Sequence, residues 1–197
     1  MKAIRISETG GPGVMKFVEV DVPTPGPGQV VLKIAGAGLC HSDLHLLHDF
    51  EEGMLPWHVP FILGHENAGY VHAVGAGVDS VAIGQAVAVF GPWGCGSCAA
   101  CGRGQDTYCI APLDGYDSAF GGGLGTNGGQ AEYMLVPDAR FLVPIPDALD
   151  PIAADLLDEY GVPMPNLGVT AAQIGPLLEF LGYRAQGGTP TETTPTT

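Results

Sequence analysis

Short stretches in which apolar and polar residues alternate, most of them bounded by glycine or proline, recur along this chain. A period of two residues is typical of half-buried β-strands. We expect strands over residues 2–6, 14–20, 29–36, 68–74, 86–90 and 131–136. Among them, residues 40–47 are the stretch best suited to one or two helical turns. Short strands at this spacing favour a small barrel or sandwich.

Helical patterns become stronger after residue 145. Asp150 and Pro151 are a good N-cap and first helical residue for a helix over 152–160. A second helix is expected over 170–183. The polar residues 185–197 have nothing to bury, which predicts a disordered tail.

The composition supports the strand pattern. The 31 glycines and 17 prolines among 197 residues argue against a helical bundle, because both residue types weaken helix interiors. The hydrophobic share of 46% is enough for a core. The length fits one well-packed domain with an appendage, and excludes a two-domain enzyme of ordinary size.

Charge and segment type narrow the partners. The net charge is −14, and no Lys or Arg occurs between Lys33 and Arg103, so we expect no nucleic-acid partner. The N-terminus lacks the apolar region of a signal peptide, and no long apolar run is present. We therefore expect a cytoplasmic protein with no membrane partner. In that compartment five cysteines point to metal ligands sooner than to disulfides.

Four of the five cysteines are clustered. Their spacing is C-x2-C-x2-C-x7-C, and the residues are Cys95, Cys98, Cys101 and Cys109. Four thiolates this close together can surround one tetrahedral zinc ion and leave no position for water, so the site is expected to be structural. Two disulfides and an iron–sulfur cluster are the alternatives.

The fifth cysteine, Cys40, belongs to a histidine-rich stretch that is followed by His65 and Glu66. A thiolate, an imidazole and a carboxylate leave a fourth position free for water or substrate, which is the arrangement of catalytic zinc. Taken singly, each histidine is better explained as a surface or hydrogen-bonded residue. For His65, the combination with Cys40 favours a metal ligand over a surface or hydrogen-bonded residue.

Four motifs together resemble the zinc-dependent medium-chain alcohol dehydrogenase family. They are C-H-S-D-L-H at 40–45, G-H-E-x-x-G-x-V at 64–71, G-P-W-G-C-G-x-C-x-x-C at 91–101 and A-E-Y-M-L-V at 131–136. The resemblance covers about residues 1–155. It implies a mainly β fold with a few helices, namely a GroES-like, partly open barrel that bears a structural-zinc lobe at residues 91–112.

The resemblance also implies roles for individual residues. Cys40 and His65 would bind a catalytic zinc, and the four clustered cysteines a structural one. Asp43 would accept a hydrogen bond from the non-ligating nitrogen of His65. Glu66 would lie behind the metal.

In this family an alcohol is oxidised to an aldehyde or ketone by hydride transfer to NAD(P). Ser42 matches the hydroxyl that takes the alcohol proton, and His45 the residue to which that proton passes through the cofactor ribose. His41 matches a contact to the cofactor pyrophosphate. The implied ligands are a small alcohol or carbonyl compound, two zinc ions and NAD(P).

Two further sets of positions follow from the resemblance less directly. The third catalytic zinc ligand is expected at Asp158, with Asp155 and Glu159 as alternatives. The aromatic residues that either line a substrate pocket or belong to the core are Phe50, Trp57 and Trp93.

We expect no counterpart of the family's cofactor domain in these 197 residues. Residues 123–128 read G-x-G-x-x-G, but they lead into a predicted strand and not into a helix, so we reject a dinucleotide-binding fingerprint. We expect a catalytic domain over 1–150, a helical segment over 151–184 and the tail. Such a chain would form a homo-oligomer or bind a separate cofactor-binding partner. The alternative function is a non-catalytic zinc-binding fragment or interaction module.

Overall fold

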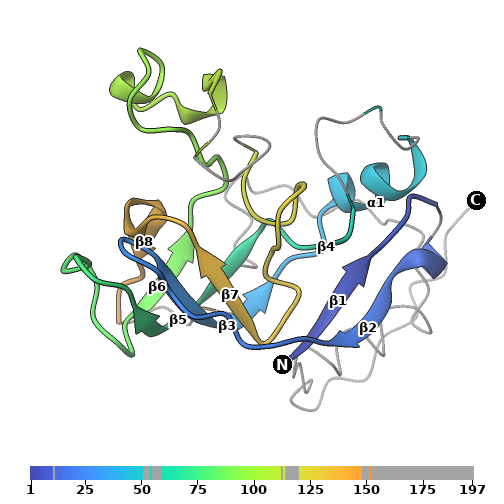
Figure 1. Ribbon diagram of the computed structural model, residues 1–197, viewed down its shortest axis with the longest axis horizontal. Helices are drawn as coiled ribbons and strands as arrows, with labels where there is room; N and C mark the ends of the chain where they lie inside the picture. The colour runs from blue at the N-terminus through green and yellow to red at the C-terminus, as the bar shows by residue number, and fades with distance from the viewer. Residues whose placement is uncertain are drawn as a thin grey trace, which may run out of the picture. The chain divides into compact units, whose positions relative to one another are not determined.

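The computed structural model describes residues 1–10, 12–50, 54, 59–111, 113, 120–147 and 151 (Figure 1). The helices predicted over 152–160 and 170–183, and the tail over 185–197, lie outside the described residues. In the described part, no helix is both long enough and apolar enough to cross a membrane.

Three strands form the smaller sheet, in the order β2 (Lys16–Glu19), β1 (Lys2–Ile6) and β4 (Phe61–Ile62). Both pairings are antiparallel. The apolar positions of β1 turn inward, and Ile6 packs with Phe61 in a buried cluster that also holds Leu47 of the helix α1 (His41–His48). The sequence pattern did not show β4, because a strand of this length has no periodicity to detect.

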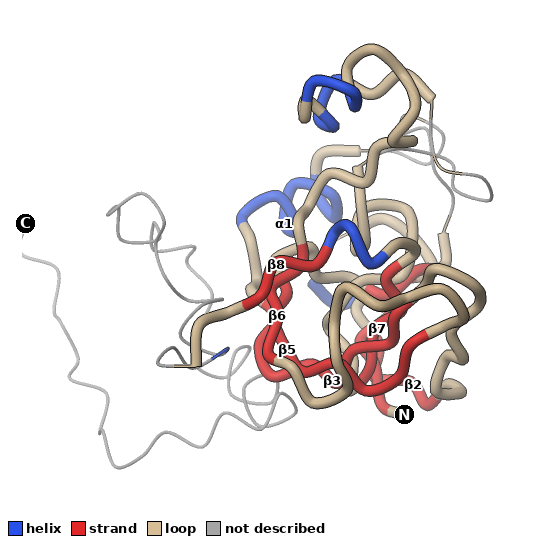
Figure 2. Tube along the Cα trace, turned by 90° about the vertical axis from the view of Figure 1, so that its left-hand side faces the viewer, coloured by secondary structure: helices blue, strands red, loops and turns tan. Residues whose placement is uncertain are grey.

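The larger sheet has five strands, all paired antiparallel. Their order is β7 (Tyr133–Val136), β3 (Val30–Ala37), β5 (Asn67–Val74), β6 (Ala86–Val89) and β8 (Leu142–Pro144). Figure 2 shows these strands, in red, as one curved layer. Four of them were predicted within a few residues, whereas β8 was not.

The two sheets are joined but do not close into a barrel. Ala3 of β1 forms an isolated bridge with Ala131, and the Ile4 amide donates to the Gln130 carbonyl at 2.8 Å. Every pairing between named strands in the described part is antiparallel, so this part contains no parallel sheet of a dinucleotide-binding domain. The predicted fold class, mainly β with a few helices in a partly open barrel, is confirmed, and the sheets stay open.

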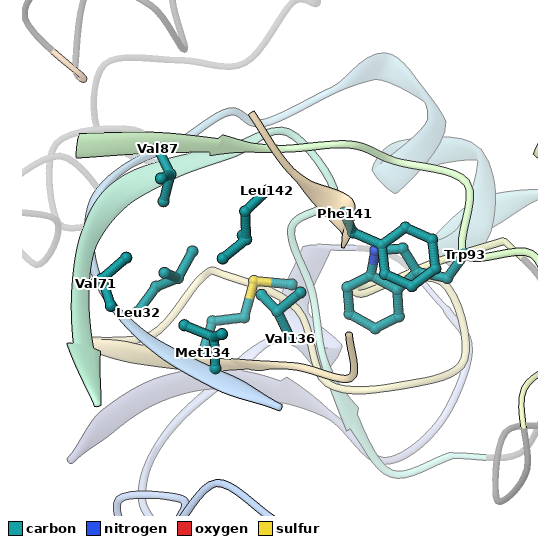
Figure 3. Close-up of a cluster of buried hydrophobic side chains, with 9 residues drawn as sticks. Leu32, Val71, Val87, Trp93, Met134, Val136, Phe141 and Leu142 are labelled. Carbon is teal, nitrogen blue, oxygen red and sulfur yellow. The ribbon is translucent and has the colours of Figure 1, made fainter. Parts of the chain in front are cut away.

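The main core lies against the larger sheet (Figure 3). Its largest side chains are Trp93 and Phe141, whose rings stack with centroids 5.9 Å apart. Around them lie aliphatic side chains from all five strands: Val30, Leu32, Val71, Val87, Met134, Val136 and Leu142. Burial of this apolar surface is the main stabilising contribution to the sheet.

In the described part of the chain, helices are short and lie between the strands. They are α1 (His41–His48) and the 3-10 turns η1 (Pro12–Val14), η2 (Cys101–Arg103), η3 (Asp106–Tyr108) and η4 (Ala139–Phe141). The helix predicted at 40–47 is therefore confirmed as α1.

Candidate metal centres

The register of β3 on β5 brings Cys40 and His65 together. Ala37 at the end of β3 pairs with Asn67 at the start of β5, and the Gly38 amide then donates to the Glu66 carbonyl at 2.8 Å. Because the strands are antiparallel, the residues that follow β3 meet those that precede β5. Cys40 and His65 thus become neighbours although 25 positions separate them in the chain.

One potential ligand atom from each of Cys40, His65 and Glu66 lies within 4.8 Å of the other two. Gly38 makes room for this group, because a Cβ at that position would lie 2.3 Å from the Glu66 carboxylate oxygen. The absence of a side chain at Gly38 thus lets the Glu66 carboxylate lie beside the ligand atoms of Cys40 and His65.

Asp43 connects the two parts of this group. Its side chain is buried, and its Oδ2 accepts a hydrogen bond from the Cys40 amide at 3.0 Å, which closes the first turn of α1. Its Oδ1 lies 3.3 Å from His65 Nδ1. One carboxylate therefore orients the backbone of one candidate ligand and the ring of the other.

The other ring nitrogen of His65 faces Ser42, whose Oγ lies 2.9 Å from Nε2. In the neutral form of His65, a proton held on Nδ1 by Asp43 leaves the Nε2 lone pair free to accept from Ser42 or to bind a metal. Burial lowers the pKa of His65, but the hydrogen bond and charge of Asp43 outweigh it and, together with Cys40, raise the pKa to about 9.

The exposed side of α1 carries the remaining predicted residues of this helix. His41 and His45 are exposed, with ring centroids 4.4 Å apart. The Nδ1 of His45 contacts Oδ2 of Asp49. The sequence analysis missed Asp49, although its position four residues after His45 on a helix would have revealed it.

The second candidate centre is the lobe that contains η2 and η3, drawn in green in Figure 1. Its four sulfur atoms are not disulfide-bonded and all lie within 4.8 Å of one another. Sulfur–sulfur distances are 3.5 Å for Cys98–Cys101, 3.9 Å for Cys98–Cys109 and 4.0 Å for Cys95–Cys101. Zinc–sulfur bonds of about 2.3 Å in a tetrahedron require about 3.8 Å, so the cluster has the right size for a zinc ion.

Close packing shapes the lobe around these sulfur atoms. A Cβ on Gly94 would lie 2.6 Å from Cys101 Sγ and 2.6 Å from Asp106 Oδ1. Arg140, which the sequence analysis missed, contacts the Gly94 carbonyl and places its Nη1 3.2 Å from Asp106 Oδ1. Since Arg140 lies in η4, this contact attaches the lobe to the sheet region.

Hydrogen bonding and desolvation move the pKa values of two lobe thiols in opposite directions. Hydrogen bonds from the Ser97 hydroxyl and from backbone amides lower the pKa of Cys95 to about 6. Desolvation raises the pKa of Cys101 to about 12. A zinc ion that binds all four thiolates must therefore displace a proton from Cys101.

Several predicted residues lie elsewhere. Trp93 belongs to the core, as one of its two expected roles stated, and donates from Nε1 to the Phe90 carbonyl at 3.0 Å. Phe50 is half-buried, while Trp57 lies outside the described residues, as do Asp158 and its alternatives. A cleft of about 270 Å³ between β1, β4 and β7 is lined by none of the candidate ligands.

Comparison with known proteins identifies the family. Residues 26–147 match the family described as Alcohol dehydrogenase GroES-like domain. The chain belongs to this family.

Two curated relatives illustrate the similarity. An alcohol dehydrogenase of Moraxella sp. (strain TAE123) is 39% identical over 77% of this chain and 42% of its own. The L-threonine 3-dehydrogenase of Pyrococcus furiosus is 38% identical over 81% of this chain and 44% of its own. This GroES-like domain thus spans less than half the length of the curated relatives it matches, and these relatives are dehydrogenases.

Solved structures agree with this assignment. The cobalt- and zinc-bound thermostable alcohol dehydrogenase from Pyrobaculum aerophilum superposes with a TM-score of 0.66 at 33% identity, over 80% of this chain and 44% of that one. The family match includes both groups of candidate ligands. In this GroES-like domain, the four-cysteine cluster can hold a zinc ion.

Proposed function

We propose that this chain is the metal-binding catalytic domain of a zinc-dependent alcohol dehydrogenase, which oxidises an alcohol to an aldehyde or ketone with hydride transfer to NAD(P). The observation that carries the proposal is the convergence of Cys40, His65 and Glu66 within 4.8 Å. A second, structural zinc is proposed for the four-cysteine lobe.

The donor set fits a catalytic zinc ion. Catalytic sites use three protein ligands of sulfur, nitrogen and oxygen type and keep one position open. Glu66 takes the third place in this proposal, with Asp158 as the alternative carried by the family resemblance. When bound there, zinc supplies Lewis-acid polarisation of a substrate oxygen and makes its proton easier to remove at neutral pH.

The roles proposed for the chain's own residues follow from their contacts. Asp43 holds the proton on His65 Nδ1 and keeps Nε2 pointed at the metal position. Ser42, whose hydroxyl lies 2.9 Å from Nε2, is placed to take the alcohol proton. His45 is exposed and contacts Asp49, so it suits the outer end of a proton path to solvent. His41 is proposed to contact the cofactor pyrophosphate.

Hydride transfer also requires that the cofactor be held close to the substrate carbon. We propose the division stated above, a catalytic domain over 1–150 followed by a segment over 151–184, with a cofactor-binding domain supplied in the intact protein or by a partner. The relatives, more than twice as long as the matched part, favour this view. The same observation keeps a second candidate, a zinc-binding module without activity of its own.

Zinc counting and cofactor titration test both candidates. We expect two zinc ions per chain, with C40S and C98S each losing one. An alcohol-dependent rise in NADH absorbance, in the chain alone or after addition of a separate dinucleotide-binding domain, supports the enzyme. The zinc-binding module is supported instead if the chain binds two zinc ions but shows neither NADH binding nor turnover, both alone and with the added dinucleotide-binding domain.

A further inference from the structure

One face of α1 carries a row of imidazoles that the proposed zinc sites do not use as ligands. The exposed residues of this face are His41, His45, His48 and Asp49. Their spacing of four, three and one residues places them on one side of an α-helix. The buried residues of α1, among them Leu46 and Leu47, lie on the other side.

The geometry of the first two histidines suits a shared metal ion. The ring centroids of His41 and His45 are 4.4 Å apart and the ring planes are nearly perpendicular, at 88°. With metal–nitrogen bonds of about 2.1 Å, two imidazoles whose bonds to one ion meet at about 90° have ring centres about 4.6 Å apart. The separation of the two rings is therefore compatible with a chelate that His41 and His45 form together.

Asp49 prepares His45 for this role. The contact of its Oδ2 with Nδ1 holds the proton on that nitrogen and leaves the Nε2 lone pair free. Asp43 has the same relation to His65. Residues of α1 thus take part in two carboxylate–imidazole pairs, Asp43 with His65 at the Cys40 group and His45 with Asp49 on the exposed face.

The local charge also favours a cation. No Lys or Arg occurs between Lys33 and Arg103, and the chain has a net charge of −14. A divalent ion at the surface of α1 therefore meets an attractive field.

From these observations we infer a third metal site, in which His41 and His45 bind an exchangeable divalent transition-metal ion and Asp49 positions His45. The nitrogen ligands select zinc, nickel or copper over calcium and magnesium. The site shares no ligand with the Cys40 group or with the lobe. If the proton path proposed above is correct, an ion bound here blocks it at His45; that consequence rests on the proposed function, whereas the metal site does not.

Equilibrium dialysis of the untagged full chain against zinc tests the inference. The chain is first saturated at its tight sites, and bound zinc is then counted by elemental analysis as free zinc is raised. We expect one further equivalent in the wild-type chain. In H41A and in H45A the loss of the chelate weakens this binding by about a hundredfold. In D49N it weakens by about tenfold.

H48A is the matched control, because it removes an exposed histidine from the same face and leaves the chelating pair intact. It keeps the further equivalent. The inference is overturned if the wild-type chain binds no further zinc, or if H41A or H45A binds it as tightly as the wild type. It is also overturned if H48A loses as much affinity for this zinc as H41A and H45A do. An inactive protein that still binds the further zinc refutes the proposed function and leaves the inference standing.

Discussion

Replacement of Asp43 by asparagine tests how the Cys40 group is organised. Asp43 is buried, accepts from the Cys40 amide at 3.0 Å and lies 3.3 Å from His65 Nδ1. In D43N the amide oxygen retains one of these contacts, while the NH2 group faces His65 Nδ1. That donor favours the tautomer with its proton on Nε2, the nitrogen proposed to bind zinc.

Loss of such an orienting carboxylate weakens metal binding by about 10- to 100-fold. At 1.36 kcal/mol per factor of ten, this corresponds to about 1.4–2.7 kcal/mol of zinc-binding free energy. The change is expected at the Cys40 group, because Asp43 contacts Cys40 and His65 of that group. The lobe zinc therefore serves as an internal reference.

Competition with a chromophoric chelator at neutral pH measures both affinities in one titration. The control is D79N, which removes an exposed carboxylate. We expect D43N to bind zinc more weakly at the Cys40 group than the wild-type chain does. D79N should bind it there with unchanged affinity. An unchanged affinity in D43N, or equal losses at both sites, would refute the orienting role of Asp43.

Three further predictions concern backbone contacts and pH. G94A should lose the lobe zinc, because its Cβ would lie 2.6 Å from a ligand sulfur; G102A, with open space around its Cβ, should keep it by elemental analysis. G38A should displace the Glu66 carboxylate and weaken the Cys40-group zinc in chelator competition, an effect absent if Glu66 is not a ligand. In the metal-free protein the pKa of His65 is raised from 6.5 to about 9. The stabilisation that the protonated ring gains from Asp43 is therefore complete below pH 6.5 and is lost as the pH rises towards 9. The thermal midpoint should fall over that range; a rising midpoint contradicts the assignment.

Local sequence was sufficient for features that depend on neighbouring residues. The spacing of the four cysteines predicted their cluster, since short glycine-rich loops restrict where the thiols lie. Alternation predicted β1, β3, β5 and β6, because each is long enough to show a period. Strands β4 and β8 are too short for that signal, and pairing with β1 and β6 defines them.

Contacts between distant residues were beyond the reach of local patterns. Arg140 is an isolated basic residue in the sequence, and only the folded chain places it against Gly94 and Asp106 of the lobe. Trp93 lies within a cysteine-rich motif, yet stacking on Phe141 puts it in the core. Burial of a side chain depends on which strands cover it, and this depends on the pairing of the whole sheet.

The sequence by itself determined the residue types of both candidate centres, the positions of the main strands along the chain and the family resemblance. The tertiary structure decided which of these residues meet. Cys40 and His65 are neighbours because Ala37 pairs with Asn67, and a bulge between Ile34 and Gly36 shifts the register just before that pair. A slip of one residue would turn the side chains to the opposite face. Register is a property of two strands together, so neither segment encodes it alone.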